Sequence, residues 1–261
     1  MRIPLPIVLV IAIGVSVLSY FLFPQDQQIG QALELAGRFD DALRYYNTAL
    51  RTNPNDETTL VRIASIHELR GEPDQAIRLY ERLTELDPTH VGYHRQLALL
   101  YEWSLRVEAA MDQRAVIADL ARDDVVVRNQ LVNYHILTKD YPAAIRRKLE
   151  VVALRAGDVD ELLELAELYG ATRQLPEAIA TYQKALAEEP ENPRVNRRLA
   201  RTYDWNGQPT EAIERYQAAL EIEPNDRATL LSLENLLLRA NRVSEAAEIS
   251  RRLAALQRGK K

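Results

Sequence analysis

The chain has 261 residues, of which 47% are hydrophobic and 27% charged, and its formal net charge is −5. The hydrophobic content suffices for a sizeable core, which excludes a chain that is disordered throughout. The absence of cysteine excludes disulfides, thiolate metal sites and cysteine nucleophiles. The mild acidity argues against a general nucleic-acid binder, which would normally carry a basic surface.

The first segment is an uncharged apolar stretch from Ile3 to Phe23. As a helix it would span about 31 Å, close to the ~30 Å hydrocarbon core of a bilayer. We therefore expect residues 1–24 to form an N-terminal transmembrane anchor. The alternative is a cleaved signal peptide, but the apolar run is long for one, and its best small-residue cleavage site, Val17-x-Ser19, lies inside it.

The charges that flank this segment predict its orientation. Arg2 and the α-amino group precede it, whereas residues 24–37 contain Asp26 and Glu34 but no lysine or arginine. The positive-inside rule places the N-terminus in the cytoplasm. We therefore predict a single-pass protein of the cell (inner) membrane, with the rest of the chain on the periplasmic or extracytoplasmic side.

The remainder repeats itself with a period of 34 residues. The segment GRFDDALRYYNTALRTNPND begins at Gly37, and the similar GQPTEAIERYQAALEIEPND begins five periods later at Gly207. A domain over 23–260 then divides without insertion into seven repeats, at 23–56, 57–90, 91–124, 125–158, 159–192, 193–226 and 227–260. The recurring residues are alanine at position 20 (Ala42, Ala76, Ala110, Ala144, Ala178, Ala212, Ala246), tyrosine at position 24 (Tyr46, Tyr80, Tyr182, Tyr216) and proline at position 32 (Pro54, Pro88, Pro190, Pro224).

Each repeat contains two amphipathic patterns that predict a pair of helices joined by a turn. Small residues at positions 8 and 20 allow the paired helices to approach closely. The proline ends the second helix, and an Asn or Asp after it caps the next one, as in Pro54-Asn55-Asp56. One pair cannot bury both of its faces, so successive pairs should stack into a solenoid with a shared core.

This signature resembles the tetratricopeptide repeat (TPR). The resemblance implies an all-α fold, a right-handed α-solenoid of seven 34-residue helix-turn-helix repeats, here preceded by one transmembrane helix. Repeats 3 and 4 depart from the pattern, because Arg114 and Lys148 replace the aromatic residue at position 24. We expect their aliphatic parts to pack while their charged ends reach solvent. The alternative is that the repeats near the middle of the solenoid pack less firmly and form a more flexible joint. In repeat 7, Ser250 at the same position fits a terminal repeat.

Catalytic motifs are missing from the sequence. It contains no P-loop, no G-x-G-x-x-G and no G-x-S-x-G. His90 and His94 have metal-pair spacing, but no glutamate base lies between them, and His90 falls at a helix start. His67 and His135 are expected to be half-buried packing residues, and the Glu161/Glu164 pair is expected on a solvated helix face. We therefore predict no enzyme activity, no metal, no cofactor and no small-molecule substrate.

The resemblance implies that the first helix of each repeat lines a groove that binds protein partners. At the groove positions of the family, the candidate partner-binding residues are Arg95, Trp103, Asn129, Asn133, Arg194, Arg197, Arg198, Arg201 and Trp205. The two tryptophans are either anchors for a partner or packing residues at the helix corners. Carboxylate-clamp repeats bind the C-terminal tails of chaperones, and Asn133, Arg194 and Arg198 match the residue types of that clamp. Asn129 stands where the clamp has a positively charged lysine, and Glu164 would repel a carboxylate.

The arginine row of repeat 6, which comprises Arg194, Arg197, Arg198 and Arg201, has two interpretations. It either pairs with the acidic row of repeat 5, at Asp160, Glu161, Glu164 and Glu167, or holds an acidic segment of a partner. Both remain open from the sequence.

The predicted function is a non-catalytic, membrane-anchored scaffold that binds protein partners and assembles a cell-envelope complex. The segments Leu-Tyr-Glu-Trp at 100–103 and Thr-Tyr-Asp-Trp-Asn-Gly-Gln at 202–208 are similar to those of envelope repeat proteins of bacterial exopolysaccharide export. Exopolysaccharide export or secretion is therefore the expected pathway. The alternatives are a cytoplasm-facing membrane adaptor and a regulatory subunit of an envelope enzyme.

Overall fold

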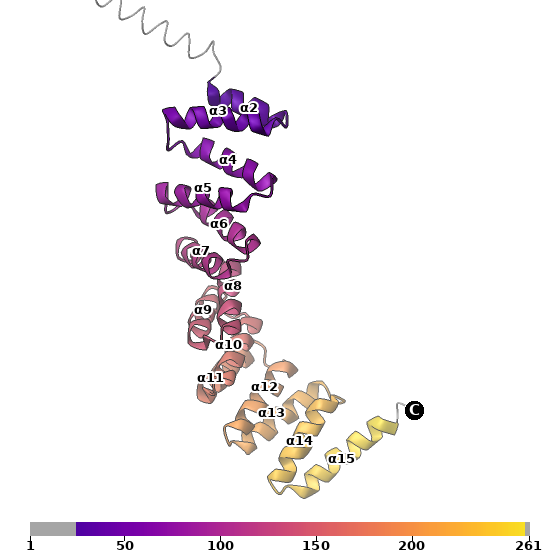
Figure 1. Ribbon diagram of the computed structural model, residues 1–261. Coiled ribbons are helices and arrows are strands. Elements are labelled where there is room, and N and C mark those ends of the chain that lie inside the picture. The colour runs from indigo at the N-terminus through magenta and orange to yellow at the C-terminus, as the bar shows by residue number, and fades with distance from the viewer. Residues whose placement is uncertain (1–24, 259–261) are drawn as a thin grey trace, which may run out of the picture. The chain divides into compact units, whose positions relative to one another are not determined.

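The structure is a computed structural model that describes residues 25–258 (Figure 1). The described residues form 14 helices and no strand, which confirms the all-α prediction for them. The predicted anchor over residues 1–24 lies outside the described residues. Among the helices from residue 25 onward, none is both long and apolar enough to span a bilayer.

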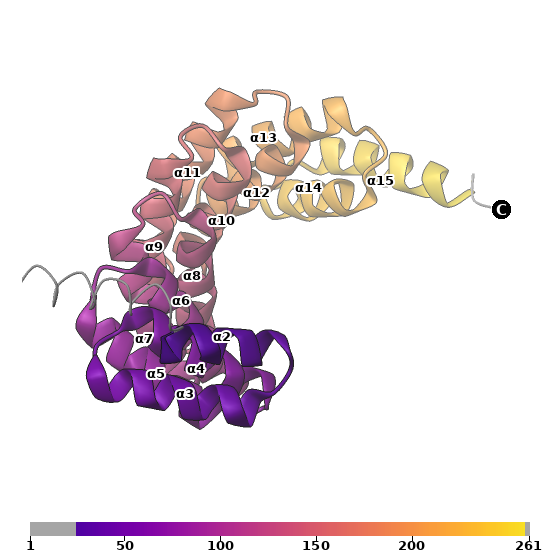
Figure 2. The same cartoon turned by 90° about the horizontal axis from the view of Figure 1, so that it is seen from above.

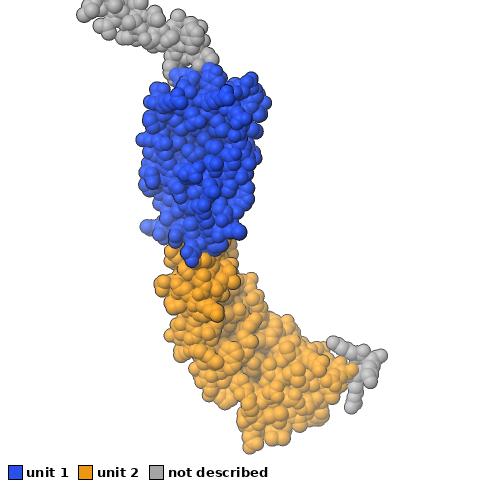
Figure 3. Space-filling model, viewed as in Figure 1, with its two compact units in different colours: residues 1–122 blue, residues 123–261 orange. Residues whose placement is uncertain are grey.

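The chain divides into two compact units, residues 1–122 and 123–261 (Figure 3). The described helices of the first unit are α2 (Asp26–Leu35), α3 (Phe39–Thr52), α4 (Glu57–Leu69), α5 (Pro73–Leu86), α6 (Val91–Trp103) and α7 (Val107–Leu120). Those of the second unit are α8 (Val125–Leu137), α9 (Tyr141–Leu154), α10 (Val159–Ala171), α11 (Leu175–Glu188), α12 (Pro193–Trp205), α13 (Pro209–Ile222), α14 (Arg227–Arg239) and α15 (Val243–Arg258). The boundary falls between α7 and α8, two residues before the end of repeat 3 at residue 124.

The helices follow the 34-residue period. From repeat 2 onward, the first helix of each repeat begins at its first residue and the second helix at position 17. Within each unit, consecutive helices pack against one another, as the pairs α2/α3 and α12/α13 show in Figures 1 and 2. Each unit is therefore a stack of helical pairs.

The alanines at position 20 explain how closely the helices of a pair can approach. Six of the seven are 0% exposed, and Ala246 in the last repeat is 1% exposed. The tyrosines at position 24 lie beside them in the core, with Tyr46 at 0% and Tyr182 at 2% exposure. In repeats 5 to 7 these residues belong to one continuous hydrophobic cluster.

The residue at position 34 of a repeat caps the first helix of the next. Asp56 accepts a hydrogen bond from the Thr59 N–H, and His90 accepts one from the Tyr93 N–H through Nδ1. The same position is occupied by the caps of α8, α10, α12 and α14, namely Asp124, Asp158, Asn192 and Asp226. These caps satisfy N–H groups that have no partner within the helix, which defines where each helix starts.

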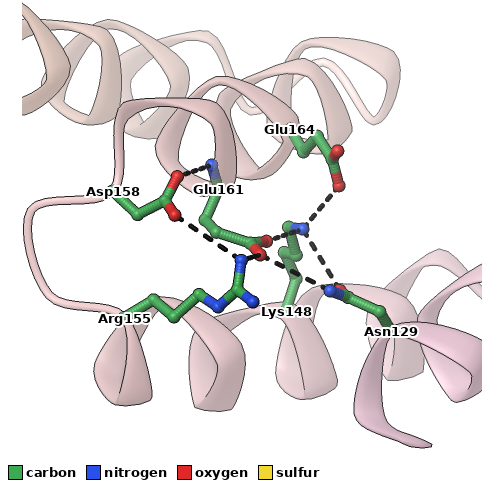
Figure 4. A network of polar contacts seen from close by, with 6 residues as sticks. All are labelled: Asn129, Lys148, Arg155, Asp158, Glu161 and Glu164. Carbon is green, nitrogen blue, oxygen red and sulfur yellow. Dashed lines mark hydrogen bonds and ion pairs between the residues drawn. The ribbon is translucent and has the colours of Figure 1, made fainter. Parts of the chain in front are cut away.

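Lys148 is not at the surface, so the expectation that its charged end reaches solvent is wrong. Its side chain is 0% exposed, and Nζ contacts the carboxylate of Glu161 directly (Figure 4). Nζ also lies 2.5 Å from Glu164 Oε2 and 3.3 Å from Asn129 Oδ1. Arg155 contacts the other oxygen of Glu161 at 3.2 Å. The ammonium remains in the interior because three oxygen acceptors replace its water.

The expected solvated position of the Glu161/Glu164 pair is therefore wrong for Glu161, which is only 6% exposed. Arg114, the other charged residue at position 24, is likewise 6% exposed rather than reaching solvent. Its Nη1 donates to Glu102 Oε1 at 2.6 Å, and this hydrogen bond lowers the pKa of Glu102 below its ordinary value. In both repeats a carboxylate from a nearby helix compensates the buried cation.

Candidate partner-binding groove

Helix α12 carries the arginine row, and its start is well defined. Asn192 Oδ1 accepts hydrogen bonds from the N–H groups of Arg194 and Val195 at 2.9 and 3.1 Å. Pro193 occupies the first turn, where its missing N–H costs nothing. The Asn192 cap and Pro193 thus fix where α12 begins, and its buried residues Val195, Leu199 and Ala200 turn the arginines away from the core.

Three of the four arginines are ion-paired. Arg194 Nη1 lies 2.8 Å from Asp160 Oδ1 and Arg198 Nε lies 3.2 Å from Glu167 Oε1, both on α10. Arg197 turns away from α10, contacts the carboxylate of Glu223 and lies 3.5 Å from Asp226 Oδ2. The pairing interpretation therefore describes part of the row.

The acidic row of repeat 5 divides between two partners. Asp160 and Glu167 face α12, whereas Glu161 and Glu164 bind Lys148 on α9. The expected pairing of the last two glutamates with the arginine row is thus wrong, because both form ion pairs with the buried lysine of repeat 4 instead.

Arg201 differs from the other three arginines. Its guanidinium carbon lies 4.8 Å from the centroid of the Trp205 ring, one helical turn later. In the described part of the chain no carboxylate lies within ion-pair distance of Arg201. The tryptophan is 50% exposed, so one side of it stays available to solvent. A cation stacked on an exposed ring gains only about 0.5–1 kcal/mol, so a partner could displace it at low cost.

The surface over α12 contains two depressions that share Arg198 and Arg201. The first, which we call the arginine depression, has a volume of about 440 Å³ and extends to Tyr216 on α13 and Thr229 on α14. The second, which we call the Trp205 slot, has a volume of about 450 Å³ and extends to α10 and α11 (helices labelled in Figure 2). Together they form a groove across α10, α12 and α14.

The floor of the Trp205 slot includes Tyr182, which is 2% exposed. Burial, and secondarily the nearby carboxylate of Glu167, raises the pKa of Tyr182 to about 12. The phenol is therefore neutral at physiological pH. Glu167 Oε1 lies within ion-pair distance of Arg198, yet it is buried and accepts no hydrogen bond from the described residues.

A tetratricopeptide-repeat family model matches residues 33–100 and 171–228, within both units. These two stretches of the chain are therefore tetratricopeptide repeats. No curated protein matches its sequence.

Two solved structures with TM-scores above 0.5 share the fold of this chain. The C-terminal part of a TPR repeat-containing protein from Cytophaga hutchinsonii is 16% identical, with a TM-score of 0.55 over 87% of this chain and 94% of that one. A structure of Naa15/Naa10 bound to HypK-THB is 17% identical, with a TM-score of 0.66 over 90% of this chain and 36% of that one. MamA is 23% identical over 64% of this chain and 92% of its own, with a TM-score of 0.45.

The other candidate residues lie elsewhere in the TPR solenoid. Asn129 and Asn133 are on α8, where Asn129 belongs to the Lys148 network and Asn133 is exposed. Arg95 and Trp103 are exposed on α6 of the first unit, with Trp103 at 55%. None of these four residues lines the groove over α12.

The histidines of the TPR solenoid have structural contacts. Besides capping α6, His90 stacks on Tyr93, with ring centroids 3.7 Å apart. His94 Nδ1 lies 2.7 Å from Gln113 Oε1, and its Nε2 lies 2.9 Å from the Pro88 carbonyl oxygen. The described residues contain no group of three His, Asp or Glu side chains that could hold a metal ion. His67 and His135 have 19% and 22% exposed side chains, half-buried as expected.

The sequence analysis missed several residues of the Trp205 slot, among them three at and after the end of α10. Gly170 and Ala171 end α10, and Arg173 follows in the turn. Arg173 lies outside the first helix, so the family's groove positions do not include it. The other two contribute by being small: a Cβ at Gly170 would meet nothing within 4 Å. The signal was Ala171 itself, because position 13 carries leucine or tryptophan in repeats 1 to 4 and 6.

Proposed function

We propose that this protein is a non-catalytic scaffold that binds a protein partner in the groove over α10, α12 and α14. The observation that carries the proposal is Arg201 stacked on a half-exposed Trp205 between two depressions. Tryptophan and arginine are the residue types that most often dominate binding energy at interfaces. Repeat solenoids offer extended surfaces of this kind, which accommodate a partner without a closed pocket.

The proposal includes a membrane anchor at residues 1–24, whose apolar stretch is 3–23, with the repeats on the extracytoplasmic side. Its support is the uncharged length of this segment and the position of Arg2 before it. Helix α2 begins at Asp26, so the repeats would start directly beside the bilayer. Tethering there raises the effective concentration of membrane-bound partners. We therefore propose the assembly of a cell-envelope complex, with exopolysaccharide export or secretion as its pathway.

Partner capture tests the groove. The full chain, solubilised from its own membranes in mild detergent after cross-linking, is compared with Trp205→Ala and with Trp103→Ala. The second variant is a matched control, because Trp103 occupies the same repeat position and is similarly exposed. The partner should be lost with Trp205→Ala and kept with Trp103→Ala. Equal capture by both variants would rule out this groove as the binding surface.

Topology is tested separately, by a reporter fused after Lys261. A reporter that is active only outside the cytoplasm should be active, and alkaline carbonate should not extract the protein from membranes. Activity of a cytosolic reporter instead would indicate a cytoplasm-facing adaptor. Release by carbonate would refute the anchor and leave the groove proposal intact.

A further inference from the structure

We infer that the Trp205 slot binds a short partner segment in which an apolar side chain lies next to carboxylates. This inference rests on the proposed function and names the chemistry of the partner. It follows from the charge, the free space and the length of the groove.

The charge of the slot is positive although the chain as a whole is acidic. Arg198 and Glu167 compensate each other at 3.2 Å. Arg201 and Arg173 also line the slot, and neither has an ion-pair partner among residues 25–258. Two guanidinium groups therefore stand beside Trp205 without a local counter-charge. Guanidinium groups bind carboxylates through short, charge-assisted hydrogen bonds.

The free space in the slot is apolar on one side. At position 13, repeats 1, 2 and 4 carry Leu35, Leu69 and Leu137, all more than 70% exposed, whereas repeat 5 carries Ala171. Together with Gly170, this alanine leaves room beside the half-exposed Trp205 ring. An apolar side chain of a partner can occupy that room and contact the indole, while neighbouring carboxylates reach the two guanidinium groups.

The groove also limits the length of the segment. The ion pairs between α10 and α12 show that these helices are neighbours, and the arginine depression extends from α12 to α14. Neither α10 with α12 nor α12 with α14 is among the closely packed helix pairs, so the groove is wider than two packed-helix spacings of about 8–10 Å each. An extended chain advances about 3.3 Å per residue, so at least about five or six residues are needed to cross it.

The test selects phage-displayed random dodecapeptides on the full chain in detergent micelles. Enriched peptides should share an apolar residue flanked by Asp or Glu. A fluorescein-labelled copy of the most enriched peptide then gives the Kd by anisotropy for the parent and two variants. Ala171→Leu fills the slot and should weaken binding about tenfold or more, a loss of about 1.4 kcal/mol or more. Arg173→Gly should weaken it roughly threefold to tenfold at low salt and less at high salt.

Both variants copy residues from the equivalent positions of other repeats, so neither should unfold the chain. Leucine stands at position 13 in repeats 1, 2 and 4, and glycine at position 15 in repeats 1, 2 and 6. Arg173 has φ +62°, a left-handed conformation that glycine adopts without strain, so Arg173→Gly should not lower the melting temperature. Leu69→Ala is the matched control for Ala171→Leu and should leave the Kd unchanged.

The outcomes separate this inference from the proposed function. Selected peptides without acidic residues, or peptides that bind Ala171→Leu as tightly as the parent, overturn the slot assignment. So does a selection that enriches nothing. In each case the proposed function stands provided that the captured partner is still lost with Trp205→Ala. If capture also survives Trp205→Ala, the proposed function fails as well.

Discussion

Lys148→Met tests whether the buried network of Figure 4 is an electrostatic unit. Methionine is unbranched and reaches as far as the Cε of lysine, but it has no ammonium. The carboxylate of Glu161, whose side chain is only 7% exposed, therefore loses its main partner. Removal of one partner from a buried ion pair costs about 3–5 kcal/mol. We expect the lower value, about 3 kcal/mol, because Arg155 still lies 3.2 Å from Glu161 Oε1. Glu164 is 61% exposed and can return to water.

The loss should be visible in thermal unfolding of the full chain followed by far-ultraviolet circular dichroism. For a domain of this size, about 3 kcal/mol lowers the melting temperature by roughly 6–12 °C. Lys184→Met is the control, because Lys184 is exposed on α11 and its replacement should change stability by less than about 0.5 kcal/mol.

A double variant distinguishes charge from packing. Lys148→Tyr with Glu161→Val copies the next seam of the solenoid, where Tyr182 and Val195 occupy the same repeat positions and are 2% and 0% exposed. Replacement of a buried ion pair by packed apolar residues is often neutral or stabilising by about 1–4 kcal/mol. The melting temperature of the double variant should therefore equal or exceed that of the parent. If it loses as much stability as Lys148→Met, the electrostatic explanation of the network is refuted.

The helical fold could be predicted from the sequence because its signals are local and repeated. Ala178 and Ala212 mark the close approach of a helix pair, and the residue that follows Pro54 and Asn55 caps the next helix. Each of these features depends on neighbours within one or two turns. Repetition at the same spacing then makes chance agreement improbable.

The buried charges could not be predicted in the same way. Lys148 and Glu161 lie on different repeats. From the sequence alone, a lysine at a core position is equally compatible with a buried ion pair and with a side chain whose charged end reaches solvent. The groove was predicted in part: Arg201 and Trp205 are at family positions, whereas the slot beside them depends on side chains that are small. A search for functional side chains does not detect free space. Ala171 is a signal in the sequence because most repeats carry leucine or tryptophan at its position, but only the structure shows which side chains surround it.

Three further predictions concern packing, ion pairs and acid stability. Ala178→Leu should overpack its helix pair and lower the free energy of unfolding by about 1–3 kcal/mol, as measured by thermal melts. Ala246→Leu should lower it less, because α15 is the last described helix and can relax outward. Equal shifts of the melting temperature in the two variants would contradict this prediction. The double variant Arg194→Ala with Arg198→Ala removes exposed ion pairs worth ~0–1 kcal/mol each, so the melting temperature should fall slightly. The Kd of the labelled peptide for this variant should show whether these arginines also contact the partner. The last prediction concerns Glu102, whose pKa is lowered below its ordinary value of 4.5, chiefly by the hydrogen bond from its arginine partner. A carboxyl with a depressed folded-state pKa stabilises the fold above its unfolded-state pKa, and this stabilisation disappears as the pH falls through the folded-state pKa. Glu102→Gln should therefore be less stable than the parent at neutral pH and should approach it as the pH falls below 4.5. A stability difference that stays constant across this acid range would show that the ion pair does not stabilise the fold.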